Sequence, residues 1–202
     1  FARLVYGLHP YGQLSYGTPE SLGSISRDDL VAFHETYYAP NTSLLAIVGD
    51  LTADEAFDGA ARVFGDWESK EIPELVLPDS VLPKRRLVVV DRPGAVQTEI
   101  RVGHLGVPRQ NSDYIALDLA TRILGGEGSN RLHRILRSER SLTYGAEANM
   151  HAWRHGGDFQ AETNTRSEAT AEVLRLIIEE FWRLQQQRVD PRELGEAQNY
   201  LS

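Results

Sequence analysis

Two hydrogen-bond donors, Arg137 and Tyr144, lie seven residues apart in the chemically densest stretch of the chain, LGGEGSNRLHRILRSERSLTY (124–144). Each can donate to a carbonyl oxygen or an oxyanion, and a phenol beside an arginine can stabilise developing negative charge. Composition alone also allows a plainer interpretation, in which Arg137 is a surface charge and Tyr144 a strand residue at the edge of the core. The residues by themselves leave both interpretations open.

Three glycines, Gly125, Gly126 and Gly128, open this stretch. Glycine adopts backbone conformations that other residues avoid, so the chain can turn sharply here after a preceding helix. A glycine turn at a helix N-terminus can also hold a phosphate group. No parallel strand precedes this turn, which weakens the phosphate interpretation.

A short, basic, amphipathic helix is expected after the glycines. Ser129 or Asn130 can cap its N-terminus. Arginines recur at positions 131, 134 and 137, so we expect them to share one flank of the helix, clear of its apolar side. The apolar side consists of Leu132, Ile135 and Leu136.

The histidine pattern predicts no metal site. Only His151 and His155, in HAWRH, are closely spaced among the six histidines. On a helix this spacing would place both on one face, as in a zinc dyad. The context indicates a strand, where residues four apart are separated by roughly 13 Å. His9, in the HPYG turn, is expected to bond the backbone. The chain also lacks cysteine, a GxSxG elbow and a P-loop.

Composition excludes several classes of protein. The 202 residues, 41% hydrophobic with a formal net charge of -8, are typical of a globular protein and lack the basic balance of a nucleic-acid binder. No apolar run is long enough to span a bilayer. The absence of cysteine is compatible with both bacterial cytoplasm and periplasm. The sequence starts at Phe1, within an apparent helix, so we interpret it as a piece of a longer protein.

The first part of the chain contains two strong helix signals. Ser26 with Asp29 and Thr52 with Glu55 form capping boxes, and the second helix is expected to run through Phe64. Between the two helices, residues 42–48 form a short apolar run that predicts a buried strand. Residues 66–84 contain three prolines and no helical period, which is typical of a domain linker.

The second part alternates strand and helix patterns. Helices are expected over 112–124, after the glycine turn, from 167 and from 190. Strands are expected at Arg86–Asp91, Gln97–Leu105, Tyr144–Ala152 and Asp158–Asn164. This order predicts the α+β class, with a mainly antiparallel sheet and helices packed on it. We expect two partial domains, over 1–66 and 85–202, joined by a linker at 67–84.

Two long motifs resemble a known family of zinc peptidases. HPYG (9–12), followed by GTPESLGSISRDDLVAFHETYYAPNTSLLAIVGDL (17–51), is similar to the second half of the N-terminal domain of pitrilysin- and insulinase-type (inverzincin) peptidases. LGGEGSNRLHRILRSERSLTYG (124–145) is similar to the glycine-loop and arginine–tyrosine region of the homologous domain that follows. Relatives include mitochondrial processing peptidase and the core subunits of the cytochrome bc1 complex. The resemblance covers nearly the entire chain, in the family's order.

The resemblance assigns roles to the residues named first. The family binds zinc through an HxxEH helix, which this sequence lacks, so zinc is expected on a missing half or a partner subunit. By resemblance, Arg137 and Tyr144 match the pair that reaches the substrate carbonyl opposite the zinc and steadies the oxyanion. By resemblance, Gly125, Gly126 and Gly128 match a loop that takes part in substrate recognition in some members of the family. No metal ligand is expected in this chain.

The resemblance therefore implies an inactive-domain fragment of a zinc metalloendopeptidase system. The parent would be a zinc-dependent peptidase or its metal-free partner subunit, and the chain alone is expected to cleave nothing. Expected partners are a peptide substrate and a homologous half or subunit, and self-association as a homo-oligomer is also compatible. A different class remains open, namely a non-catalytic assembly subunit like the bc1 core proteins.

Overall fold

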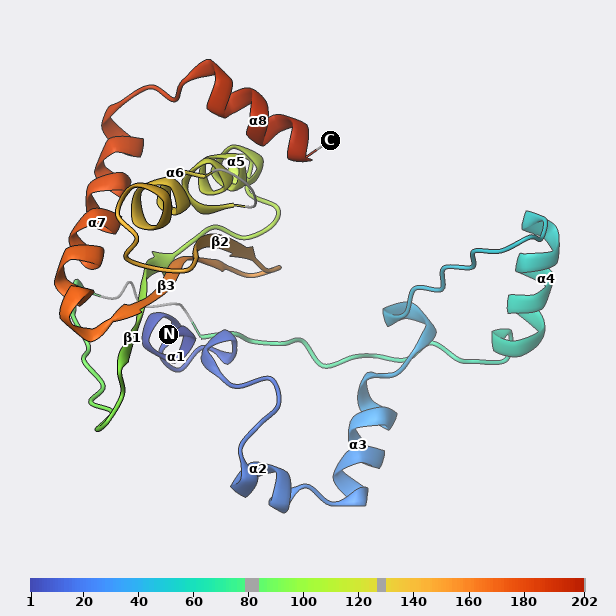
Figure 1. Ribbon diagram of the computed structural model, residues 1–202. Coiled ribbons are helices and arrows are strands. Elements are labelled where there is room, and N and C mark those ends of the chain that lie inside the picture. The colour runs from blue at the N-terminus through green and yellow to red at the C-terminus, as the bar shows by residue number, and fades with distance from the viewer. Residues whose placement is uncertain (79–83, 127–129, 202) are drawn as a thin grey trace. The chain divides into compact units, whose positions relative to one another are not determined.

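The computed structural model describes residues 1–78, 84–126 and 130–201, and the chain divides into two compact units (Figure 1). Phe1–Gly12 and Ser80–Ser202 form the first, which we call the sheet unit. Gln13–Asp79 form the second, which we call the helical unit.

The sheet unit is built on three antiparallel strands in the order β1-β3-β2. They are β1 (Gln97–Leu105), β2 (Ala146–Ala152) and β3 (Gly157–Arg166). In the register, Ile100 lies opposite Thr163, and Ala148 lies opposite Ala161. Ile100 of β1 is buried in the core. The sheet and its helices confirm the predicted α+β class.

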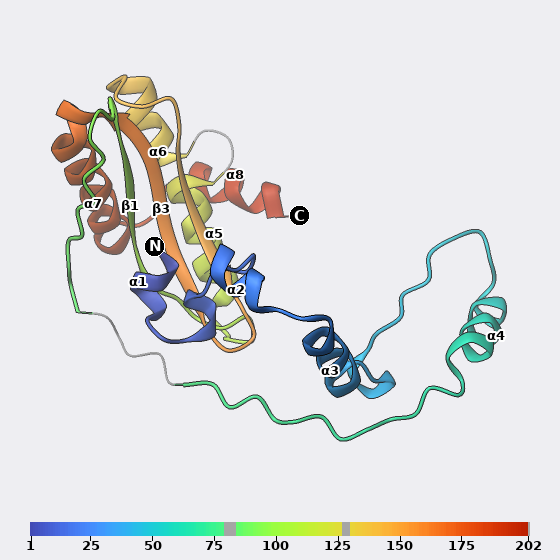
Figure 2. The same cartoon turned by 90° about the horizontal axis from the view of Figure 1, so that it is seen from below.

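Helices cover one face of this sheet (Figures 1 and 2). They are α5 (Tyr114–Gly125), α6 (Arg131–His133), the π-helical segment η3 (Arg134–Glu139) and α7 (Thr170–Gln186), which follows a short 3-10 turn. Their apolar sides and the sheet enclose one core, in which the most deeply buried side chains include Leu124, Leu132, Leu136, Val173 and Ile177. The last helix, α8 (Pro191–Leu201), packs on α5. None of the helices described is long and apolar enough to cross a membrane.

The N-terminal segment lies on the opposite face of the sheet (Figure 2). It comprises α1 (Ala2–Tyr6) and the 3-10 turn η1 (Pro10–Gly12). The buried Tyr6 hydroxyl donates to Asp158 Oδ1 at 2.9 Å, and Asp158 Oδ2 lies 3.0 Å from His151 Nδ1. Burial and this carboxylate raise the pKa of Tyr6 above its ordinary value. These contacts hold the segment in the sheet unit, although the sequence placed it with the first domain.

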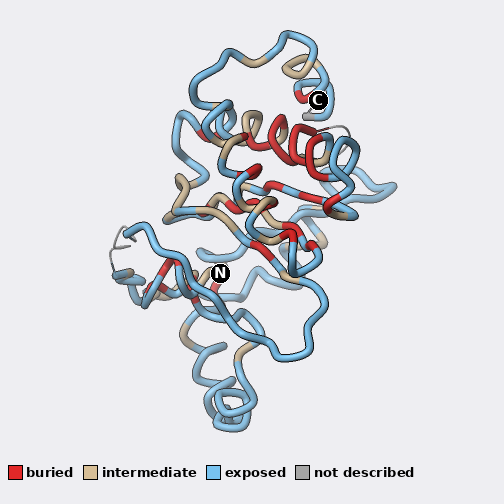
Figure 3. Tube along the Cα trace, turned by 60° about the vertical axis from the view of Figure 1, so that its left-hand side comes forward, coloured by how far each residue is buried: buried red, intermediate tan, exposed pale blue. Residues whose placement is uncertain are grey.

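The helical unit consists of short helices without a core. It contains α2 (Pro19–Ser24), α3 (Arg27–Tyr37), the 3-10 turn η2 (Pro40–Thr42) and α4 (Ala53–Phe64). The predicted capping boxes are confirmed, because Ser26 caps α3 and Thr52 caps α4. Among its described residues only Ala39 is buried, and Figure 3 shows the buried chain concentrated in the sheet unit.

Two predicted strands are wrong. Residues 43–48 and 86–91 have no regular structure and are exposed throughout, with Leu44 91% and Val89 81% accessible. A strand requires a neighbour that takes up its backbone N–H and C=O groups. No strand in the described part of the chain pairs with either run, so the apolar pattern alone does not produce a strand. The division into two homologous domains remains a prediction.

Candidate functional site

Arg137 projects from a π-helical segment. The predicted apolar side of its helix is confirmed, since Leu132, Ile135 and Leu136 are all buried. Asn130 caps the helix as predicted, accepting the His133 N–H at 2.7 Å. From Arg134 to Glu139 the helix widens to π geometry. This geometry is rare in proteins as a whole, and where it does occur it is often found at functional sites. The side chain of Arg137 is exposed on the outer side of this segment.

A tight reversal joins this helix to Tyr144. Ser141 has a φ of 52°, and it is the one non-glycine residue with positive φ in the described ranges. Such backbone conformations cost energy and cluster at functional sites. The Ser141 N–H donates to Arg137 O at 3.0 Å, and the Leu142 N–H donates to Leu136 O at 2.8 Å. Leu142 then re-enters the core, which fixes where the following residues emerge.

Tyr144 has an anchored backbone and a free side chain. Its neighbour Thr143 places Oγ1 2.9 Å from Thr163 Oγ1 on β3, and Thr163 Oγ1 donates to Gly145 O at 2.7 Å. The Thr143 hydroxyl and the Gly145 carbonyl, one on each side of Tyr144, therefore both bind Thr163 and hold the chain to the sheet. The side chain of Tyr144 is 81% exposed. The phenol is thus presented to solvent from a fixed backbone, immediately before β2.

Arg131 does not share the exposed flank that the spacing predicted. Its side chain is 9% exposed and makes a bidentate ion pair with Glu193 of α8, with Nη2 2.7 Å from Oε2. This hydrogen bond lowers the pKa of Glu193 and raises that of Arg131. Arg131 therefore fastens α8 to the helix that carries Arg137.

Arg137 differs electrostatically from its neighbours. Arg134 lies 3.7 Å from Glu139, and Arg140 lies 3.4 Å from Glu172, so carboxylates offset both charges. Arg137 makes no ion pair with any described residue. Within the described ranges, its one side-chain hydrogen bond is to His133 Nε2, at 3.3 Å. Its guanidinium is thus exposed, cationic and available to an oxygen atom from another molecule.

The glycines have clear packing roles. Gly125 closes α5 directly against β2, so a β-carbon there would overlap the backbone of Ala148. At Gly126 a β-carbon would lie 2.8 Å from Arg122 Cα. Gly128 lies outside the described residues. A role of these glycines in substrate binding remains a prediction.

The two histidines of HAWRH, His151 and His155, bond to different partners. His151, on β2, bonds to Asp158, while the His155 backbone N–H donates to the Tyr11 hydroxyl at 3.3 Å. His9 is buried, and its Nδ1 accepts the Tyr11 N–H, as predicted for a turn histidine. Among the described residues no three potential metal ligands lie together. These residues therefore do not fit a zinc site.

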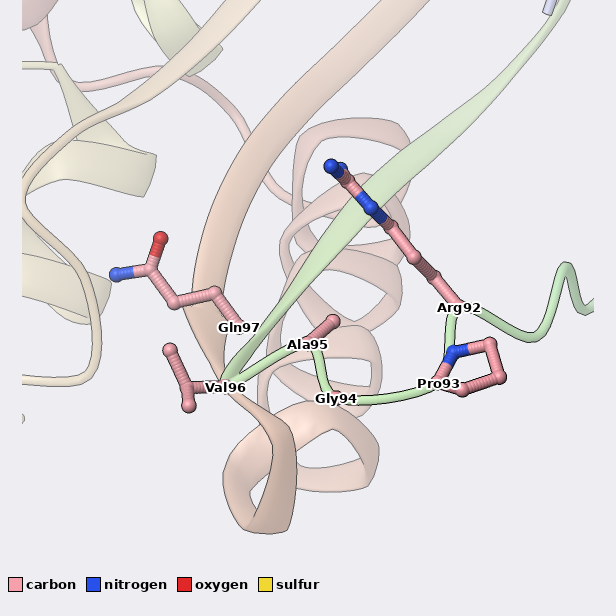
Figure 4. Close-up of a pocket in the computed structure, with 6 residues that line it drawn as sticks. All are labelled: Arg92, Pro93, Gly94, Ala95, Val96 and Gln97. Atoms are coloured by element: carbon pink, nitrogen blue, oxygen red, sulfur yellow. The ribbon is translucent and has the colours of Figure 1, made fainter.

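A shallow hollow before β1 is formed by six consecutive residues, 92–97 (Figure 4). Arg92 and Gln97 point to different sides of the turn, and the remaining lining comes from Pro93, Gly94, Ala95 and Val96. Their polar groups do not converge. The hollow includes neither Arg137 nor Tyr144 and carries no site.

Comparison with known proteins identifies relatives of the whole chain. Residues 24–201 match the family model described as "Peptidase M16 inactive domain". A crystal structure of a peptidase M16 inactive domain from Pseudomonas fluorescens superposes with a TM-score of 0.90, at 31% identity over 99% of this chain and 48% of that one. The zinc protease PqqE of Helicobacter pylori is 22% identical over 100% of this chain and 48% of its own length. The chain thus spans about half the length of these relatives.

A more distant solved structure shares the fold. A chain of complex III2 from Candida albicans matches with a TM-score of 0.81 at 15% identity, over 99% of this chain and 50% of that one. At this identity the match shows the fold alone.

Proposed function

We propose that this chain, which belongs to the M16 peptidase family as an inactive domain, forms the substrate-side half of a peptidase chamber. In this role Arg137 and Tyr144 donate hydrogen bonds to the substrate's scissile carbonyl oxygen. Both groups stabilise negative charge on that oxygen as it develops during hydrolysis. Zinc and the attacking water belong to the half that this chain does not span, since the described residues do not fit a zinc site.

The observation that carries the proposal is the state of Arg137. Arg131, Arg134 and Arg140 all face carboxylates, and Arg137 alone among the four keeps an unpaired cationic head at the surface. The π-helical turn and the left-handed Ser141 add two backbone departures within the same eight residues. Energetically costly geometry beside an uncompensated charge is typical of a binding site.

Two further parts of the proposal concern the loop and the domain organisation. Gly125, Gly126 and Gly128 would shape the loop beside the bound peptide. The chain would consist of two partial homologous domains, over 1–66 and 85–202. The boundary between the helical and sheet units falls after Asp79, inside the linker predicted at 67–84, and Phe1–Gly12 belong to the sheet unit.

A charge-conserving change tests the role of Arg137. In the chain assembled with a zinc-bearing M16 half, Arg137→Lys should lower kcat about tenfold or more for a fluorogenic peptide, because an ammonium cannot reproduce the guanidinium's fork of donors. Arg134→Lys is the matched control. It should leave kcat within about twofold, because Arg134 already forms an ion pair with Glu139 and is not expected to contact the substrate.

Equal kcat in the two variants would remove Arg137 from the mechanism. If the parent chain assembled with a zinc-bearing half hydrolyses no peptide at all, a non-catalytic assembly role explains this chain better.

A further inference from the structure

The guanidinium of Arg137 is held by a neutral hydrogen-bond acceptor. Its Nη1 lies 3.3 Å from Nε2 of His133, four residues earlier in the same helix. Arginine has donors and no acceptor, so His133 Nε2 must accept this hydrogen bond through its lone pair. The imidazole is therefore in a neutral form, with its proton on Nδ1. Arg137 Nε and Nη2 donate to no other described residue and stay available to a ligand.

The backbone of His133 is fixed by the cap of this helix. Its N–H donates to Asn130 Oδ1 at 2.7 Å, and Asn130 Nδ2 donates to the carbonyl of Gly126 at the end of α5. Asn130 is buried, and Leu132, next to His133, is buried in the core. The imidazole thus projects from a backbone that is tied both to α5 and to the core. A hydrogen bond to such an acceptor restricts a long side chain that would otherwise sample many rotamers.

The carboxylates bonded to this helix pair with arginines other than Arg137. Glu139 lies 3.7 Å from Arg134. Glu172 lies 3.4 Å from Arg140. A carboxylate bonded to Arg137 would orient its guanidinium but would also offset its charge. A neutral imidazole orients the guanidinium and leaves the whole positive charge for a ligand.

We propose that His133 is a positioning residue for Arg137, whose guanidinium it orients toward the substrate oxyanion without reducing its charge. The inference rests on the proposed function, in which Arg137 donates to that oxygen. An arginine that is already oriented loses less rotamer freedom when the oxyanion forms, and preorganised donors are those that stabilise a transition state. The contribution of His133 therefore falls on kcat, whereas KM changes little.

Three substitutions of His133 distinguish orientation from charge in the chain assembled with a zinc-bearing M16 half. His133→Leu removes the acceptor and should lower kcat for a fluorogenic peptide about three- to tenfold, with KM within about twofold. His133→Gln keeps a neutral acceptor that reaches about as far as Nε2, so kcat should stay within about twofold of the parent. His133→Glu keeps an acceptor but adds a negative charge, and should lower kcat about tenfold.

Control measurements exclude general effects of these substitutions. His155→Leu removes an exposed imidazole from the turn between β2 and β3, and should leave kcat within about twofold. The circular dichroism spectrum should be the same for the parent and for every His133 variant, because Asn130 caps the helix through the backbone N–H of His133, which each variant retains.

Nitrogen NMR of the chain alone tests the hydrogen bond without turnover. At about pH 8, where histidine is ordinarily uncharged, the ring proton of His133 should be on Nδ1, because Nε2 accepts from Arg137. His133→Leu identifies the signals of this ring by their loss. Arg137→Leu removes the donor, so the preference for a proton on Nδ1 should disappear.

Each of three results would overturn the positioning role. They are a parental kcat in His133→Leu, an equal loss of kcat in His133→Leu and His133→Gln, and a ring proton on Nε2 of His133 in the parent. If Arg137→Lys lowers kcat and His133→Leu does not, the positioning role is wrong and the proposed function stands. If Arg137→Lys leaves kcat unchanged, the proposed function fails and the positioning role fails with it.

Discussion

The two units of this chain are built from equally apolar sequence, yet only one of them has a core. In the sheet unit, residues such as Leu124 and Leu136 are almost inaccessible between helices and sheet. In the helical unit, α3 and α4 form with well-made caps, but no apolar face is covered (Figure 3). Local sequence signals are therefore sufficient to form helices, whereas a hydrophobic core requires contacts between segments that are far apart in the sequence. The candidate site lies in the unit that has this support.

The largest effect should come from truncating a core leucine. Leu124→Ala should lower the free energy of unfolding by about 2–5 kcal/mol, because the side chain is 1% exposed and leaves a cavity. Leu30→Ala, at an exposed position of α3, should change it by less than about 0.5 kcal/mol. Urea unfolding monitored by circular dichroism measures both. Similar losses would show that the helical unit has a core of its own and that the two units do not differ in this respect.

A smaller effect should come from the ion pair that fastens α8. The pKa of Glu193 is lowered by Arg131 in the folded protein, so its contribution to stability is complete above the ordinary glutamate pKa and is lost as the pH falls through the lowered value. Stability should therefore decline on acidification below about pH 4.5. Glu193→Gln should reduce this part of the decline, measured by urea unfolding between pH 3 and pH 7.

Glu196 provides the matched control for Glu193. It pairs with Arg192 on the exposed surface of the same helix, where solvent screens the attraction between the two charges. Glu196→Gln should leave the pH dependence close to that of the parent chain. If both variants change the pH dependence of stability equally, the ion pair between Arg131 and Glu193 does not hold α8 more strongly than an exposed ion pair would.

The same contrast explains what could be predicted from sequence. The C-terminal end of α4 at Phe64 and the caps at Ser26 and Thr52 follow from residues close together in the chain, and all are confirmed. The strands expected at 42–48 and 86–91 are wrong because pairing depends on a neighbour, which hydrophobic pattern does not supply.

The candidate site shows the same division. The exposure of Arg137 and the burial of Leu132, Ile135 and Leu136 follow from helical periodicity. The burial of Arg131 does not, because its partner Glu193 comes from 62 residues further along the chain. Neither the π-helical turn nor the left-handed Ser141 has a local signal, since serine has no preference for positive φ.

Turnover of Tyr144→Phe in an assembled enzyme tests the central claim most directly. Removing the phenol hydroxyl deletes one donor to the oxyanion and should lower kcat about 10- to 1,000-fold with little change in KM. Tyr16→Phe removes a similarly exposed hydroxyl from the helical unit and should leave kcat unchanged. If neither Tyr144→Phe nor Arg137→Lys lowers kcat below that of the parent chain, the two residues do not stabilise the oxyanion and the proposed role is wrong.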